Sequence, residues 1–552
     1  MLSGRLSVVQ LSLVSLLSSH LHLGDTKSMT LPEASTPLPS MPRANRMVMP
    51  MVFVGGMSSI AIELATSRLI APYFGTSTFI WANLIGLTLA YLALGYYIGG
   101  ILADRYPSAA LLFAIAMVAG VSAGFIPYLS RPVLRASLGA IDSVDAGAFY
   151  GSLIGVIVLL AVPVTCFGCF TPFAIRLRAT GVESTGRTAG RVWALSTVGS
   201  ILGSFLPVLI LIPLFGTRNA FLILSVLVIS IAAVGLLASR ATMLALVAAG
   251  SAMLLVTLGT VVDSGSIKPP YRGELVEEAE SDYHYIQVLN DDGRYLLALN
   301  EGHAIHSIHD PQNVVTGGPW DYFAIAPLFL DNEDASIESA LIVGLAGGTA
   351  ARTILEVFPD ATVDGVEIDA DIVELGEKYF ALSDPRITSF VEDGRYFLST
   401  TDSTYDMIGI DAYRQPYIPF HLTTTEFFYE VADQLNLDGV VVVNAGRTAT
   451  DFRLVDALAS TMLDIFPYVY LIDAERYHNT LIFGTFAPSG VGNLVARAAS
   501  SDPSLPLGEI ATSAVATGLP RVAEQTIDPY TDDHAPVEWL VDRMILNAAQ
   551  DD

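Results

Sequence analysis

The sequence predicts a multi-span helical membrane domain followed by a doubly wound α/β domain. Two observations support this prediction. Apolar segments long enough to cross a bilayer, about 20 residues each, recur through the first half of the 552-residue chain. In the second half, strand-like apolar runs alternate with amphipathic helical patterns, which is typical of parallel sheets covered by helices. A chain of this length also exceeds one ordinary core.

The charge distribution divides the chain at about the same place. Residues 1–262 contain 7 acidic and 14 basic residues, a net charge of +7, whereas residues 263–552 contain 48 acidic and 14 basic residues, a net charge of −34. An acidic half repels phosphates, which excludes nucleic acid as a partner. It attracts cations, and a polyamine substrate is a cation, although a solubilising surface would look the same.

Seven segments are apolar enough to span a membrane, which implies a lipid bilayer as a partner. They are residues 48–71, 79–102, 109–129, 149–172, 192–215, 219–238 and 241–262. Residues 1–47 hold a short apolar stretch and a Ser/Pro/Thr-rich linker, and we place them outside the fold. The membrane domain is therefore expected over 48–262.

Loop charges predict a topology for these segments. The loop after the fourth segment is the most basic and contains Arg176, Arg178, Arg187 and Arg191. The positive-inside rule then places the N-terminus inside and, with seven spans, the acidic half outside.

Several residues within the segments carry alternative interpretations. Glu63 and Arg68 form a structural pair or line a polar pathway. The stretch 95–107 is similar to the short loop motif of major facilitator transporters. Cys166 and Cys169 lie in an apolar run, which favours packing over redox or metal chemistry.

The soluble half is predicted as a small β subdomain over 263–335 and an α/β domain over 336–552. The predicted strands are residues 340–345, 362–367, 387–391, 405–411, 439–444, 467–473 and 479–485. The predicted helices are residues 349–358, 370–379, 424–436 and 451–465.

A glycine turn lies where the first of these strands meets its helix. Gly344, Gly347 and Gly348 allow backbone N–H groups and the helix N-terminus to approach a ligand closely. Glu367 ends the second strand, 19 residues after Gly348, where an acid can bind both ribose hydroxyls. Together these features predict a nucleoside site.

Two further acids distinguish between nucleosides. Asp393 and Gly394 follow the third strand, where adenine-reading acids lie in adenosylmethionine-type folds, and Asp411 ends the fourth strand at the same sheet edge. The sequence lacks the G-x-G-x-x-G of pyrophosphate-binding cofactors. An adenosyl-sulfonium cofactor is favoured over a nicotinamide.

These residues resemble the spermidine synthases (polyamine aminopropyltransferases), and more closely their membrane-fused, multi-span relatives. The resemblance covers residues 272–485 and 531–540. The matching motifs are Ser281-x-Tyr283-His284-x-Ile286, Gly344-Leu345-Ala346-Gly347-Gly348, Val366-Glu367-Ile368-Asp369, Asp393-Gly394 and Asp411-Ala412-Tyr413-Arg414-Gln415-Pro416.

The resemblance implies a Rossmann-like domain of the class I methyltransferase type and transfer of an aminopropyl group. The donor would be decarboxylated S-adenosylmethionine, and the acceptor a polyamine such as putrescine. Asp411 is expected as the base or electrostatic anchor, because an ammonium has no lone pair with which to attack. Tyr283 and Tyr413 would shape the amine's slot, and His284, in the family's Gln position, would contact the cofactor. No metal is implied.

Three positions depart from the family's pattern. Gly347 replaces the loop acid that holds the cofactor's amine, and Arg414 replaces the second carboxylate of the D-x-x-D pair. Asp321 is the one acid left where the family has Y-H-E, and it is expected at the substrate. Lost anionic contacts weaken diamine binding, by about 1–3 kcal/mol each. The sequence therefore predicts a retained cofactor site and a rebuilt amine site.

Four histidines have open roles. His303, His306 and His309 recur every third residue, which on a strand alternates faces and disfavours a zinc site. They are expected on the active-site rim or the surface. His421 follows Asp411 and lies near the cleft or helps to cap the helix near Thr424.

The leading hypothesis is a membrane-anchored aminopropyltransferase. An S-adenosylmethionine-dependent methyltransferase is the alternative, since Arg414 can meet the carboxylate of the intact cofactor. A third reading combines a transporter-like membrane domain with a nucleoside-sensing soluble domain. A cytosolic cofactor places the catalytic domain in the cytoplasm beneath the cell membrane, against the loop charges. The resemblance also implies a homo-oligomer.

Overall fold

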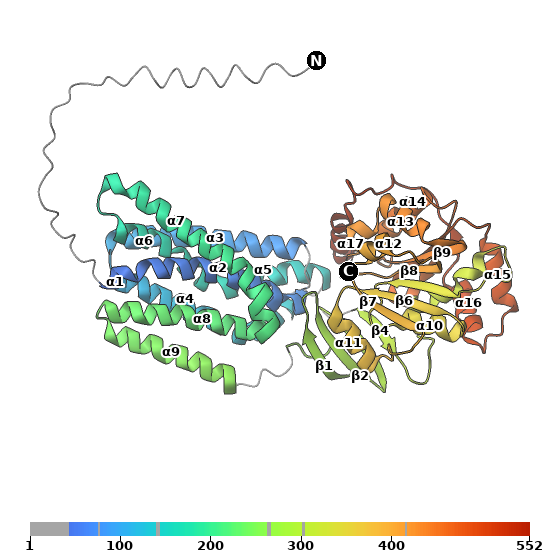
Figure 1. The fold of residues 1–552 in the computed structure, drawn as a ribbon, viewed down its shortest axis with the longest axis horizontal. Coiled ribbons are helices and arrows are strands. Elements are labelled where there is room, and N and C mark those ends of the chain that lie inside the picture. The colour runs from blue at the N-terminus through green and yellow to red at the C-terminus, as the bar shows by residue number, and fades with distance from the viewer. Residues whose placement is uncertain are drawn as a thin grey trace, which may run out of the picture. The chain divides into compact units, whose positions relative to one another are not determined.

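The computed structural model describes residues 43–551 apart from 75–77, 140–143, 262–266, 301–303 and 415–416. Residues Arg43–Asp552 form one compact unit (Figure 1). Most of the N-terminal segment 1–47 lies outside the described residues, as do His303, Gln415 and Pro416. The predicted domain boundaries at residues 262 and 335 remain predictions.

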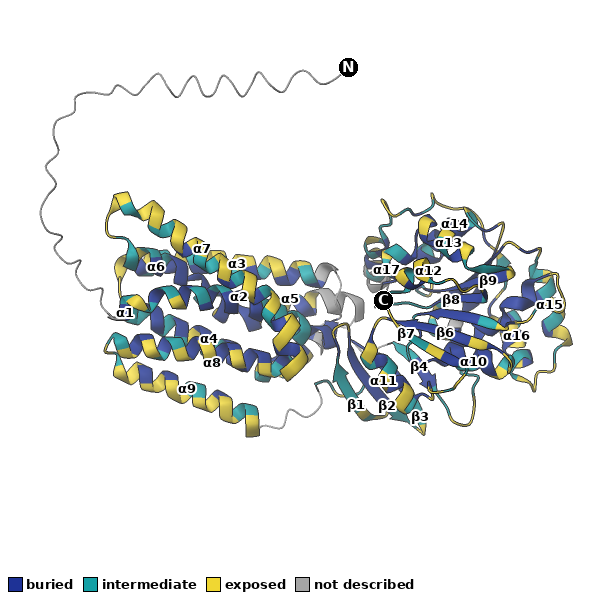
Figure 2. Cartoon of the chain, viewed as in Figure 1, coloured by how far each residue is buried: buried dark blue, intermediate teal, exposed yellow. Residues whose placement is uncertain are grey.

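In the first half of this unit, the regular structure of the described residues is helical. Its helices are α1 (Arg43–Arg46), α2 (Val48–Phe74), α3 (Thr78–Arg105), α4 (Ala109–Gly139), α5 (Val144–Gly168), α6 (Phe170–Arg178), α7 (Val182–Leu206), the π-helical η1 (Pro207–Leu211), α8 (Ile212–Ala238) and α9 (Thr242–Val261). Large apolar side chains are exposed along them, among them Leu89 and Met253 (Figure 2). Such surfaces suit contact with lipid.

Within the described part of the chain, six helices are long and apolar enough to cross a membrane, where the sequence predicts seven segments. The difference lies in one 57-residue helical stretch, Val182–Ala238, which contains the two predicted segments 192–215 and 219–238. At about 1.5 Å per residue, 57 residues exceed what a single crossing needs. Gly216 has non-helical backbone (φ 77°) and interrupts this stretch between the two segments.

Glycines bring the helices of this half into close contact. A Cβ on Gly199 of α7 would lie 2.2 Å from the carbonyl oxygen of Phe53 in α2, and one on Gly203 would lie 2.1 Å from that of Met57. Close backbone approach through small residues is how helices associate where no hydrophobic effect drives them together. The composition of α7 therefore fits its position against α2.

Arg68 of α2 contacts main-chain carbonyls rather than Glu63. Its guanidinium donates to the main-chain carbonyls of Ser281 and Asp282. The arginine thus satisfies backbone acceptors next to the small β sheet, which is a structural role.

The second half contains two sheets. A four-stranded antiparallel sheet consists of β1 (Glu274–Glu280), β2 (Tyr285–Asp291), β3 (Arg294–Leu299) and β4 (Ile305–His309). The eight-stranded sheet consists of β5 (Ser339–Val343), β6 (Thr362–Glu367), β7 (Ile387–Val391), β8 (Tyr405–Ile410), β9 (Leu435–Gly446), β10 (Tyr468–Ala474), β11 (Asn479–Thr485) and β12 (Arg521–Val522). Its order is β12-β10-β11-β9-β8-β5-β6-β7.

Helices pack on both faces of the larger sheet, and apolar clusters fill the space between (Figure 1). The described helices of this half are the 3-10 helices η2 (Pro319–Phe329), η3 (Phe420–Leu422) and η4 (Glu475–Tyr477), and the α-helices α10 (Thr349–Val357), α11 (Ala370–Tyr379), α12 (Gly394–Thr400), α13 (Thr425–Asp433), α14 (Arg453–Leu463), α15 (Val491–Ser500), α16 (Pro506–Thr517) and α17 (Val537–Asp551). The predicted fold class, a helical membrane domain before a Rossmann-like α/β domain, is confirmed.

One detail of the predicted sheet is wrong. Strands β5 to β9 are parallel, but β11 runs antiparallel to both β9 and β10. Only four residues connect β10 to β11, with His478 at φ 54°. A parallel connection needs a crossover of a dozen or more residues, so this short turn forces a hairpin.

The strand order reverses between β5 and β8. β5 continues through α10 to β6 on one side, whereas β8 pairs with its opposite edge. Loops leave the carboxyl ends of these two strands in opposite directions and open a crevice, the usual ligand site of such sheets.

Candidate active site

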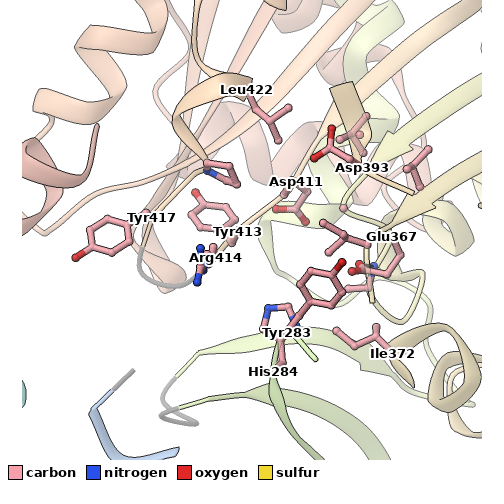
Figure 3. A pocket seen from close by; sticks show the side chains of 18 of the residues that line it. Tyr283, His284, Glu367, Ile372, Asp393, Asp411, Tyr413, Arg414, Tyr417 and Leu422 are labelled. Carbon is pink, nitrogen blue, oxygen red and sulfur yellow. Dashed lines mark hydrogen bonds between the residues drawn. The ribbon is translucent and has the colours of Figure 1, made fainter. Parts of the chain in front are cut away.

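The crevice between β5 and β8 holds a cavity of about 610 Å³. Nine residues predicted from the sequence line it: Tyr283, His284, Gly344, Glu367, Asp393, Gly394, Asp411, Tyr413 and Arg414. Figure 3 shows Glu367, Asp393 and Asp411 around this one cavity, although the three acids come from different strand ends. We call it the donor cavity.

The glycine turn shapes the floor of the donor cavity. Gly344 has φ 89°, and a Cβ there would lie 2.5 Å from the carbonyl oxygen of Asp411, so only glycine fits. Gly348 has φ 78° and begins α10. The β5 loop and the β8 loop therefore touch at backbone level, which brings Asp411 next to the turn.

Gly347 and Gly348 do not line the cavity. The N–H of Gly347 donates to Oγ of Ser307 in β4 at 2.8 Å. A Cβ on Gly347 would lie 2.9 Å from Cβ of Ser307 and 3.0 Å from Cγ of Phe380. The small sheet thus occupies the space in which a side chain at position 347 would stand.

Glu367 ends β6 and is buried, at 7% exposure. Its Oε2 accepts the N–H of Ala346 at 2.9 Å, and its Oε1 accepts that of Asp369 at 3.2 Å. Burial raises the pKa of this carboxyl, while the N–H donors lower it. The two N–H groups fix the carboxylate at the cavity wall, and each oxygen keeps acceptor capacity for a ligand hydroxyl.

His284 is held from behind by a buried acid. Its Nδ1 lies 2.9 Å from Oδ2 of Asp369, which also accepts the hydroxyl of Ser281. Asp369 caps α11 through the N–H of Asp371. The motifs at 281–286 and 366–369, which are far apart in sequence, therefore form one hydrogen-bonded corner of the cavity.

Asp393 has two functions in the structure. Its Oδ1 accepts the N–H groups of Arg395 and Tyr396 at 3.0 Å and caps α12. Its Oδ2 lies 3.3 Å from Nε2 of His421, which also lines the cavity. Thr424 itself caps α13 by accepting the N–H of Phe427. Of the two roles open for His421, the structure favours the cleft.

Asp411 follows β8 and is tied to the neighbouring strand. The side-chain N–H of Asn444 in β9 donates to its Oδ1 at 2.8 Å. Burial raises the pKa of Asp411 to about 7, the Glu367 carboxylate adds to the rise, and Asn444 and Trp320 oppose it. A carboxyl with this pKa can accept and release a proton near neutral pH.

Tyr413 is fixed to the end of β9. Its hydroxyl donates to the carbonyl of Asn444 at 2.8 Å and accepts the N–H of Gly446 at 2.7 Å. The ring stands beside Asp411 in Figure 3. Because its hydroxyl both donates and accepts a hydrogen bond within the protein, Tyr413 forms a rigid part of the cavity wall.

The remaining predicted residues lie apart from one another. Tyr283 and Arg414 are exposed at the cavity mouth. Asp321 does not line any of the cavities described here; its carboxylate accepts the N–H groups of Thr316 and Gly317 at 2.9 and 2.7 Å. Asp321 therefore braces the turn before η2 and presents its neighbour, Trp320, towards Asp411.

Sequence reasoning missed Asn444 and Trp320, whereas His306 was expected on the active-site rim or the surface. Asn444 follows a run of valines in β9. In the sequence, the one indication of a role at the site was a polar residue near the carboxyl end of a buried strand. His306 lines the donor cavity from β4, while His309 does not. Among the described residues, no group of three His, Cys, Asp or Glu side chains is placed to hold a metal ion.

A scan against protein families matches residues 325–482 to the spermine/spermidine synthase domain. This range includes Glu367, Asp393, Asp411 and Asn444. Residues 325–482 form a spermine/spermidine synthase domain.

Curated relatives of these residues include polyamine aminopropyltransferases and an eEF1A lysine and N-terminal methyltransferase of Xenopus laevis, which is 26% identical over 156 residues, 26% of this chain and 22% of the relative. A probable polyamine aminopropyl transferase of Bifidobacterium longum is 36% identical over 194 residues, 35% of this chain and 42% of the relative. A polyamine aminopropyltransferase of Vibrio vulnificus is 29% identical over 204 residues, 36% of this chain and 66% of the relative. The chain thus covers less than two thirds of either relative.

Solved structures are similar to the soluble half at a lower level. The crystal structure of a probable spermidine synthase from Corynebacterium glutamicum is 19% identical, with a TM-score of 0.37. The similarity covers 46% of this chain and 96% of that structure.

Proposed function

We propose that this chain is a membrane-anchored transferase that moves an aminopropyl group from decarboxylated S-adenosylmethionine to a primary amine, with putrescine as the reference acceptor. The synthase domain supports an adenosyl-sulfonium co-substrate. The observation that supports the proposal most is the position of Asp411, a carboxyl with a pKa of about 7 on the same cavity wall as Glu367 and Asp393.

In this proposal, different residues of the donor cavity bind different parts of the donor. Glu367 accepts the ribose hydroxyls, and Asp393 with Gly394 takes the adenine edge. The close approach of Gly344 to Asp411 brings the donor's reacting carbon beside the base. His284 and Tyr283 close the opposite wall.

The proposed transfer is an in-line displacement. The amine nitrogen forms a bond to the aminopropyl carbon, and the bond between that carbon and sulfur breaks. Its electron pair stays on sulfur, giving neutral methylthioadenosine, and the proton lost by the amine passes to Asp411. Asn444 and Trp320 keep part of Asp411 ionised, since each lowers its pKa. Alignment and proton removal are the two contributions asked of the protein.

Methyl transfer from intact S-adenosylmethionine is the second candidate, and one observation favours it. Arg414 lines the donor cavity, and it forms no ion pair with an acid among the residues that the structure describes. A guanidinium there can bind the carboxylate that only the intact cofactor carries.

The test gives the detergent-purified full chain each donor with putrescine and other amines, and identifies the released nucleoside by mass spectrometry. Methylthioadenosine that depends on the decarboxylated donor is expected. Release of S-adenosylhomocysteine would establish methyl transfer instead. For the anchor, we expect the protein to leave membranes with detergent and to remain in them after a high-salt wash.

A further inference from the structure

A second cavity of about 710 Å³ meets the donor cavity at Asp411. Both cavities are lined by His306, Ala346, Asp411 and Tyr413, so these four residues form the junction. Trp320 and Asn444 line the second cavity only. A molecule seated in it would present one end to Asp411 from the side opposite the nucleoside. We call it the acceptor cavity.

The acceptor cavity has an unexpected charge for a site that should take a diamine. Among the described residues, its walls include four arginines and two acids, Asp310 and Asp411. The arginines are Arg272, Arg294, Arg447 and Arg476. The donor cavity differs, since Asp282, Glu367, Glu392, Asp393 and Glu538 line it in addition to Asp411.

Two of the four arginines are neutralised in part. Arg272 and Arg294 share one acid, Asp291, with 3.0 Å between Nη2 of Arg294 and Oδ2 of Asp291. A single carboxylate thus faces two guanidinium groups. This pair leaves one positive charge at that end of the acceptor cavity.

Of the other two arginines, Arg447 follows the last residue of β9, and Arg476 lies in the turn between β10 and β11. Arg447 is buried, at 8% exposure; its Nη1 donates to the carbonyl of Thr448, and the guanidinium lies 4.5 Å from the ring centre of Phe452. Arg476 lies 5.4 Å from the ring centre of Tyr477 and forms no ion pair with another described residue. Stacking on aromatic rings holds both groups in place.

These arginines are connected to the catalytic junction through the backbone. The N–H of Arg447 donates to the carbonyl of His478 at 2.8 Å, which joins β9 to the turn that carries Arg476. The preceding residue, Gly446, donates its N–H to Tyr413. The positive wall and Asp411 are therefore parts of one hydrogen-bonded frame at the strand ends.

We propose that the acceptor is a primary amine that also carries a carboxylate. Its amine meets Asp411 at the junction, and its carboxylate meets Arg476. The distal ammonium of putrescine would face the guanidinium of Arg476 instead, and like charges in such a site oppose binding. A carboxylate matches the planar fork of an arginine. This proposal rests on the proposed function, because it assigns the acceptor of that reaction; the bonds made and broken stay the same.

Three amines test the charge requirement with little other change. Ornithine is putrescine with one carboxylate added, and 4-aminobutyrate has a carboxylate in place of one of putrescine's aminomethyl groups. Each is titrated by calorimetry into the detergent-purified full chain saturated with methylthioadenosine. We expect ornithine and 4-aminobutyrate to bind at least ~10-fold more tightly than putrescine, the scale of one charge-assisted contact. Tighter binding of putrescine would overturn the proposal.

Charge variants locate the carboxylate site. Arg476→Glu should reverse the preference towards putrescine, and the milder Arg476→Gln should abolish it. Arg543→Gln is the matched control, because Arg543 is also exposed and stacked, 4.4 Å from the ring centre of Trp539, but lines neither cavity. An unchanged preference in both Arg476 variants, with unchanged melting temperatures, would contradict the assignment.

Turnover measured in parallel separates this proposal from the proposed function. If putrescine is preferred and methylthioadenosine is released, aminopropyl transfer stands and the acceptor class is wrong. If the carboxylate-bearing amines bind preferentially but only S-adenosylhomocysteine is released, the acceptor class stands and aminopropyl transfer is wrong.

Discussion

The donor and acceptor cavities share Asp411 but differ in charge. Acids dominate the donor cavity, where a positively charged sulfonium would bind, whereas arginines dominate the acceptor cavity. The donor side matches the family's motifs at Glu367, Asp393 and Asp411. Apart from the junction residues Ala346, Asp411 and Tyr413, the acceptor side is built from residues outside those motifs. The two sides of one reaction centre can therefore change independently, because different loops supply them.

Asp411→Asn should have the largest effect, because Asp411 is common to both cavities. We expect turnover to fall by about 10²–10⁴-fold, the usual range for loss of a general base. Binding of methylthioadenosine should stay within a few-fold, which calorimetry can measure. Turnover that survives this change would mean that Asp411 does not receive the proton.

The same variant makes a prediction about stability. The folded-state pKa of Asp411 is raised to about 7 from an ordinary 3.8. Its burial therefore disfavours the ionised form, and the cost in stability accumulates as pH rises from about 4 to about 7. Asp411→Asn should melt at about the same temperature as the native chain near pH 4, and at a higher temperature at pH 8.

Glu367→Gln should weaken binding of the donor without changing binding of the acceptor. Loss of the carboxylate weakens donor binding by about 10–100-fold, as for a hydrogen bond to a charged group. The KM for the donor should rise, and acceptor binding should stay unchanged. Glu333→Gln is a control, since Glu333 is exposed and lines neither cavity. An equal loss of acceptor affinity would show that the sides are coupled.

Asn444→Ala should move the pH dependence of turnover. Asn444 lowers the pKa of Asp411, so its removal raises that pKa further. Because the carboxylate is the active form, the rising limb of kcat/KM should shift to higher pH, by about one unit if the hydrogen bond contributes ~1.4 kcal/mol. A shift to lower pH would contradict the assigned role of the asparagine.

Arg414→Ala should have the smallest effect and sharpen the choice of donor. If Arg414 meets the carboxylate of intact S-adenosylmethionine, affinity for that donor falls several-fold while affinity for the decarboxylated form does not, since an exposed charge pair contributes up to about 1 kcal/mol. Equal affinities for both donors before and after the change would remove the main support for methyl transfer.

The sequence predicted the features that are local in the chain. Strands β5 to β8 and the turn at Gly344 follow from apolar runs, glycines and acids at strand ends. The hairpin of β10 and β11 was missed because both strands read as buried runs, and only the short turn between them reveals their direction. The helix count differed because Gly216 separates segments that remain continuous by hydrogen bonding.

The acceptor side was far less predictable. Asn444, Arg447 and Arg476 have no shared motif, and they come together only because β9 and the β10–β11 turn end at one edge of the sheet. Asp321 was expected at the substrate because it is acidic, but its carboxylate serves the Thr316–Gly317 turn. Acidity alone cannot distinguish a ligand contact from a braced turn.

The crowding around Gly347 limits how this site can be redesigned. An aspartate at that position would need room now taken by Ser307 and Phe380, so a single substitution cannot reinstate the family's loop acid without displacing the small sheet. Conversion towards a diamine-binding site would first require a smaller residue in place of Phe380 or Ser307. A variant with only that change would not bind the diamine more tightly. The chain therefore resists reversion one substitution at a time, and an engineer should change positions 347 and 380 together.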